Sequence, residues 1–162
     1  MQTKSAISRI AGALVAPLVF ACGAYAAELA SHEHHAAGLT ALKLNAGKKW
    51  ATDEPLRKGM EEIRNAIAAD KETIHAGKMS AAKYDALAKK IDGQVVYAVQ
   101  NCKLPSDADA QLHLILGEMT HGLDAAKGKD KKISRRAGVE KIIASLTAYD
   151  KHFDHPGWRA LN

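Results

Sequence analysis

The residues best suited to chemistry in this chain are three histidines near the N-terminus. The segment HEHH places His32, His34 and His35 around Glu33, so three imidazoles and a carboxylate fall within four residues. Imidazole-rich sites favour divalent transition metals, in the order copper, nickel and zinc. The segment therefore predicts binding of one of these metals, and the structural alternative is a polar tail that binds nothing.

The other candidate ligands are single residues spread along the rest of the chain, and each also has a structural interpretation. Methionine fills gaps in cores, a lone cysteine on an apolar stripe is typical of a buried thiol, and a protonated histidine stabilises a helix C-terminus. The candidates for a cofactor are Met60 and His152, and those for a metal are Cys102, His113 and His155.

Residues 1–26 have the pattern of a secretory signal peptide. Lys4 and Arg9 precede an apolar run too short to span a bilayer, and residues 24–26 (AYA) form a small-x-small cleavage site. We therefore expect a periplasmic protein with no transmembrane span after cleavage. The alternative is processing at Cys22, where VFAC resembles a lipoprotein box and would tether the protein through a lipid.

The composition limits the fold classes and the functions that are expected for this chain. The chain has 162 residues, 47% of them hydrophobic and 5% aromatic, which suits one mainly helical domain. The lysines are scattered among acidic residues rather than clustered with aromatics, so nucleic-acid binding is not predicted. No carboxylate pair, nucleophile triad or phosphate loop stands at a usable spacing, and an enzyme is not predicted either. Cys102 is the single cysteine after the signal and cannot form an internal disulfide.

Four amphipathic helical segments are expected within residues 52–155, after a flexible lead-in at 27–51 and before a tail at 156–162. Thr52 or Asp53 can cap the first segment, Ser80 the second and Ser106 the third. Apolar residues recur at three and four positions, as on one face of a helix. The four stripes are Leu56, Met60, Ile63 and Ile67; Tyr84, Leu87, Ile91, Val95, Ala98 and Cys102; Leu112, Leu116, Met119 and Leu123; and Val139, Ile142, Leu146, Tyr149 and Phe153.

Short connections between one-sided helices favour an antiparallel up-down-up-down four-helix bundle, with the lead-in as an extended N-terminal arm. This topology places the N-termini of the first and third helices at the same end of the bundle as the C-termini of the second and fourth helices. The candidate ligands assigned to that end are Met60, Cys102, His113, His152 and His155. The sequence leaves open whether the domain forms a homodimer.

Two stretches resemble the cytochrome b562 family. LRKGMEEIRNAI (residues 56–67) resembles the opening of its first helix, and residues 116–153 are similar in spacing to its third and fourth helices. The resemblance implies a non-covalent haem held by Met60 and by a histidine late in the last helix. Asp150 stands at that histidine position, and the nearest histidine is His152. No CxxCH motif is present for covalent attachment.

The start of the domain, LNAGKKWATDEPLRKGM (residues 44–60), also resembles small exported bacterial proteins without an established activity. Metal binding or metal handling is therefore the leading functional expectation. Electron transfer through a non-covalent haem is the first alternative, and a binding or structural module without a cofactor is the second.

Overall fold

The computed structural model describes residues 38–161, and most of this part is helical. The helices and short strands are the 3-10 helix η2 (Gly38–Ala41), β1 (Trp50–Ala51), α1 (Glu54–His75), α2 (Ala81–Asn101), α3 (Ser106–Ala126), α4 (Arg135–His152) and β2 (Phe153–Asp154). The predicted all-α class is confirmed. The predicted signal peptide, Cys22 and the HEHH segment lie outside the described residues.

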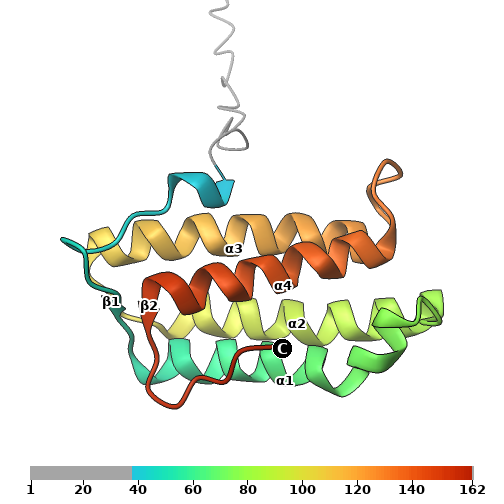
Figure 1. Cartoon of the computed structure of the whole chain (residues 1–162), viewed down its shortest axis with the longest axis horizontal. Coiled ribbons are helices and arrows are strands. Elements are labelled where there is room, and N and C mark those ends of the chain that lie inside the picture. The colour runs from blue at the N-terminus through green and yellow to red at the C-terminus, as the bar shows by residue number, and fades with distance from the viewer. Residues whose placement is uncertain (1–37, 162) are drawn as a thin grey trace, which may run out of the picture. The chain divides into compact units, whose positions relative to one another are not determined.

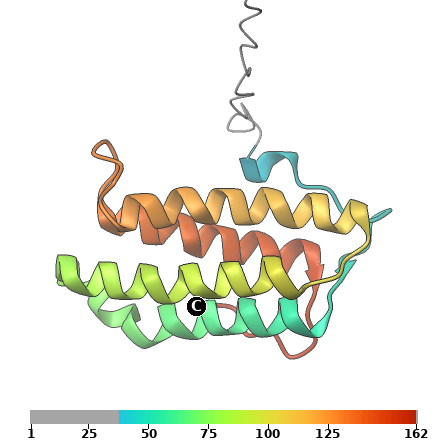
Figure 2. The ribbon, with the colours of Figure 1, turned by 180° about the vertical axis from the view of Figure 1, so that it is seen from behind.

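The four long helices run in alternating directions and form a bundle, as the sequence predicts (Figures 1 and 2). The closest packing is between α3 and α4 and between α1 and α2. Each helix turns its apolar stripe inward, and Leu56, Ile63, Ile91 and Ile142 have no exposed surface. Burial of these stripes removes apolar surface from water and holds the bundle together. In residues 38–161 no helix is long and apolar enough to cross a membrane.

Side chains cap three of the four helices. Asp53, Ser80 and Ser134 each accept a hydrogen bond from a backbone N–H in the first turn of α1, α2 and α4. The expectation for α3 is wrong, because Ser106 is already the first helical residue and Pro105 occupies the cap position without a side-chain bond. The fixed φ of Pro105 suits the entry to the helix, so the turn starts one residue earlier than a serine cap would place it.

Two helical glycines allow α3 and α4 to approach closely. A Cβ atom on Gly122 would lie 2.6 Å from the carbonyl oxygen of Gly138, and one on Gly138 would lie 2.5 Å from the backbone nitrogen of Ala126. These neighbours are backbone atoms, which cannot move aside as a flexible side chain can. The contact between the two helices therefore requires glycine at both positions.

The lead-in is folded over residues 38–51, which differs from the flexible segment that the sequence predicts there. Leu39, Leu42 and Trp50 pack partly buried against the core, and η2 lies against α3. Trp50 Nε1 also donates a hydrogen bond to the carbonyl oxygen of Lys43, at 2.7 Å. The segment holds too few apolar residues for a helical period, so its packing leaves no periodic signal in the sequence.

The chain after α4 returns along the bundle. β2 pairs in parallel with β1, with Trp50 opposite Phe153 and Ala51 opposite Asp154. Trp158 and Leu161 then pack partly buried against the core, and the side chain of Arg64 donates to the carbonyl oxygen of Arg159 at 2.9 Å. The predicted tail is therefore packed against the bundle as far as residue 161, and one hydrogen bond joins it to α1.

Candidate functional site

The expected convergence of chain segments at one end of the bundle is present. Asp53 links two of them, because one carboxylate oxygen accepts from Leu56 N–H at the start of α1 and the other accepts from Lys103 N–H just after α2. The Thr52 hydroxyl donates to the carbonyl oxygen of Asp154 at 2.6 Å, which joins the same end to the segment after α4. Arg57 in turn donates to the carbonyl oxygen of Thr52 at 2.7 Å.

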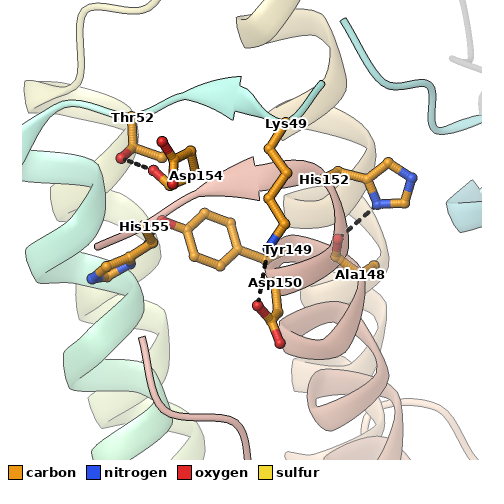
Figure 3. Close-up of polar contacts among 8 residues, drawn as sticks. All are labelled: Lys49, Thr52, Ala148, Tyr149, Asp150, His152, Asp154 and His155. Carbon is orange, nitrogen blue, oxygen red and sulfur yellow. Dashed lines mark hydrogen bonds and ion pairs between the residues drawn. The ribbon is translucent and has the colours of Figure 1, made fainter. Parts of the chain in front are cut away.

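An aromatic cluster of Tyr149, Phe153, His155 and Trp158 closes this end. The rings of Tyr149 and Phe153 stack at 5.3 Å between centroids, and Trp158 meets Tyr149 edge-on at 5.2 Å. The Tyr149 hydroxyl lies 3.0 Å from His155 Nδ1, within hydrogen-bond distance, and the planes of the two rings are nearly perpendicular, at 87°; Figure 3 shows His155 near the hydroxyl end of Tyr149. The cluster is a packing unit with one internal polar contact.

Burial sets the ionisation of both polar members of this cluster. Loss of solvent raises the pKa of Tyr149 well above its ordinary value, so the phenol keeps its proton. Burial also lowers the pKa of His155, and the nearby Arg57 guanidinium acts in the same direction while Glu61 and Asp154 oppose it. A neutral His155 therefore accepts the hydrogen bond that the Tyr149 hydroxyl donates.

The lowered pKa of His155 predicts a loss of stability in mild acid. An unfolded chain takes up the proton near the ordinary pKa of 6.5, before the folded chain does. The contribution of this group is therefore fully present above pH 6.5 and is lost as the pH falls below it. Urea unfolding at pH 7.5 and 5.5 should show a lower free energy of unfolding at pH 5.5. His155→Gln should reduce this difference, and an equal difference in both proteins would contradict the assignment.

Met60 and His152 do not form the pair of axial ligands that the resemblance implies. Met60 is fully buried and belongs to the same core cluster as Leu56 and Phe153, which are also unexposed. His152 lies on the outer side of α4, and in Figure 3 its ring points away from Tyr149 and His155. A haem between the helices would have to displace packed side chains and would still not meet His152. The residues present do not fit a haem at this end.

Cys102 and His113 each have surroundings that do not favour metal binding. Burial raises the pKa of the half-buried Cys102 thiol, and the carboxylates of Asp53 and Asp109 raise it further, which disfavours the thiolate that binds metals. His113 is exposed, and its Nδ1 lies 2.9 Å from the carbonyl oxygen of Asp109. Within residues 38–161, no three histidine, cysteine or acidic side chains are grouped so that they could hold one metal ion.

A hollow of about 430 Å³ lies beside His152, on the flank of α4. Its lining comes from the 3-10 helix of the lead-in and from the last turns of α4, namely Leu39, Ala144, Thr147, Ala148, Lys151 and His152. Sequence reasoning missed this hollow because it assigned residue 39 to a flexible segment. The pattern in the sequence that could have indicated it is the run of small side chains on the outer face of α4, two alanines and a threonine, which leave room there.

A second hollow of about 430 Å³ lies at the opposite end of α3 and α4, and its charges are largely paired. Lys129 bonds Asp124 at 2.8 Å, and Glu118 forms an ion pair with Lys141 and lies 3.6 Å from His121 Nδ1. The hydrogen bond from Lys141 lowers the pKa of Glu118, which keeps this carboxylate ionised. The arrangement is typical of a solvated surface ion-pair network.

Comparisons with models of protein families, with curated proteins and with solved structures give no match. The resemblance to cytochrome b562 therefore stays a prediction from the sequence, and the four-helix bundle is the part that the structure confirms.

Proposed function

We propose that this protein is an exported, non-catalytic metal-binding protein that takes up a divalent transition-metal ion through His32, His34 and His35. The observation that carries the proposal is the density of ligands, three imidazoles within four residues directly before the folded lead-in. Copper(II) is the ion expected to bind most strongly, followed by nickel and zinc.

The bundle supplies a folded support for this histidine segment. The chain from Gly38 onward is held on α3 by η2 and by a hydrogen bond from Lys43 N–H to the Gln111 side chain, at 2.8 Å. Signal cleavage after residue 26 would leave the histidines near a new N-terminus, where a metal ion can reach them. Such a protein would load or buffer metal in the compartment to which it is exported.

Titration of the purified chain with copper(II), followed by isothermal calorimetry, tests the proposal. Intact mass must first show that residues 32–35 are retained. We expect about one tight site per chain, and its loss when His32, His34 and His35 are all replaced by alanine, because each imidazole removed takes away a ligand. The matched control replaces His75, His113 and His121, an equal number of histidines on the bundle. Unchanged binding in the first variant, or loss in the control alone, would overturn the proposal.

A further inference from the structure

The excess positive charge of the described part lies in one half of the bundle. Residues 70–92 and 124–141 contain 12 lysines and arginines against 7 acidic residues, whereas the rest of residues 38–161 contains 9 of each. The two ranges include the α1–α2 turn and the α3–α4 loop, which lie at the same end of the bundle in Figures 1 and 2. We call this half, residues 70–92 and 124–141, the basic end.

The two loops of the basic end are parts of one surface. Arg135 at the start of α4 forms an ion pair with Asp85 in the first half of α2. A Cβ atom on Gly77, in the α1–α2 turn, would lie 3.9 Å from Nη1 of Arg136 at the start of α4. The charges of both loops therefore act on the same region of solvent.

Four exposed lysines at this end have ammonium groups that no carboxylate neutralises. Within residues 38–161, Lys78, Lys83, Lys131 and Lys132 form no ion pair, and Lys131 donates to the carbonyl oxygen of Gly128 at 3.0 Å. The two arginines at the start of α4 are both paired with acidic side chains. Lysine is a flexible point charge, whereas arginine suits two-pronged recognition of one anion. The free charges therefore suit attraction to an extended anionic surface.

Two helix N-termini add to the positive potential of the basic end. α2 and α4 begin there, and neither has an acidic residue in its first turn. α1 and α3 begin at the opposite end, and their first turns contain Glu54, Asp107 and Asp109. A helix N-terminus carries a partial positive charge, which an acidic side chain would offset. The N-termini of α2 and α4 therefore reinforce the lysines.

The basic end offers no apolar or aromatic anchor for a partner. The large apolar residues exposed in the described part are Leu44, Val96 and Val99, which all lie outside residues 70–92 and 124–141. Tyr84, the single aromatic residue in these two ranges, is buried. Protein interfaces usually depend on aromatic or arginine anchors, and single-stranded nucleic acid stacks its bases on aromatic side chains. Anionic lipid headgroups need neither, because they attract basic residues by charge.

We propose that the basic end docks this protein on a membrane surface that contains anionic phospholipids. The ammonium groups of Lys78, Lys131 and Lys132 would lie among the headgroup phosphates, and the bundle would stand on this end. The opposite end, with the aromatic cluster and β1, would face away from the lipid. The inference does not depend on the proposed metal binding.

Co-sedimentation of the purified chain with lipid vesicles tests the inference. We expect binding to vesicles of phosphatidylglycerol and phosphatidylcholine in equal parts, little binding to phosphatidylcholine alone, and release at high salt, because salt screens exposed charges. Replacing Lys78, Lys131 and Lys132 by glutamine should weaken binding about 100-fold, since each basic residue near such a surface contributes about fivefold.

The matched control replaces Lys43, Lys48 and Lys103, three exposed lysines at the opposite end, by glutamine. It removes the same charge and should leave binding nearly unchanged, and any contribution of residues 1–26 is the same in all three proteins. Equal weakening in both variants, or no preference for the phosphatidylglycerol vesicles, would overturn the inference. Binding to polyglutamate or duplex DNA without binding to the vesicles would also overturn it, and would indicate an acidic protein or a nucleic acid as the partner.

Discussion

Replacing Gly138 by alanine should lower the free energy of unfolding by about 3 kcal/mol, at the upper end of the cost of overpacking a core. The new methyl group would lie 2.5 Å from the backbone nitrogen of Ala126 and 2.6 Å from the carbonyl oxygen of Gly122. Neither atom can move without shifting a whole helix, so α3 and α4 would have to separate. Urea unfolding followed by circular dichroism measures the change.

Gly117 is the matched control, because it lies within α3 as Gly138 lies within α4, but a Cβ atom on Gly117 would have no atom within 4 Å. Gly117→Ala should raise the stability by about 0.5–1 kcal/mol, the ordinary benefit of alanine over glycine in a helix. Both variants replace glycine by alanine, so changes of opposite sign in the free energy of unfolding would isolate the effect of the close approach between α3 and α4. A similar gain in both variants would show that α3 and α4 are not in contact at Gly138.

Phe153→Ala should lower the free energy of unfolding by about 4 kcal/mol, as expected for removing a fully buried aromatic ring. Phe153 has no exposed surface, stacks on Tyr149 and pairs through its backbone with Trp50. Its loss would leave a cavity at the point where the lead-in and the end of α4 meet. The expected change is large because neighbouring helices cannot collapse into the space without breaking this pairing.

An apolar residue on the surface separates this effect from a general loss of hydrophobicity. Val99 on α2 has 51% of its surface exposed. Val99→Ala should change the free energy of unfolding by less than about 0.5 kcal/mol. A loss of only about 1 kcal/mol in Phe153→Ala would contradict the packed bundle end, and would reopen the question of space for a ligand there.

The sequence predicts the bundle well because its signal is repeated along every helix. The stripe from Leu56 to Ile67 and the stripe from Val139 to Phe153 each contain several residues at helical spacing, and these residues are buried as expected. Hydrophobic periodicity of this kind depends on local geometry and survives small errors in the helix boundaries. The helix order and the meeting of distant segments at one end follow from short connections.

Features that depend on single contacts are not predictable in this way. Gly122 and Gly138 carry a weak signal, since glycine within a helix is costly and suggests a close approach, but the sequence does not show which helix comes near. The packing of Leu39 and Trp50 leaves no periodic pattern. The side of α4 to which His152 points follows from its helical position, while the hollow beside it depends on the lead-in.

The placement of the candidate ligands divides them into two groups. Met60 contributes to the core, and His155 bonds Tyr149 within an aromatic cluster, so packing accounts for both residues. His152 has a hydrogen bond to the carbonyl oxygen of Ala148 that fixes its tautomer, and it lines a hollow beside the lead-in. The metal hypothesis therefore rests on the HEHH segment and not on the bundle end.

The metal content of the native protein tests the central claim most directly. The protein would be purified without chelators from the cells that produce it, alongside the variant lacking His32, His34 and His35, and measured by inductively coupled plasma mass spectrometry with a visible spectrum of each sample. We predict close to one copper, nickel or zinc ion per chain in the unmodified protein, far less in the variant, and no haem band in either. Equal metal content in the two proteins, or a haem band in the unmodified protein, would contradict the account.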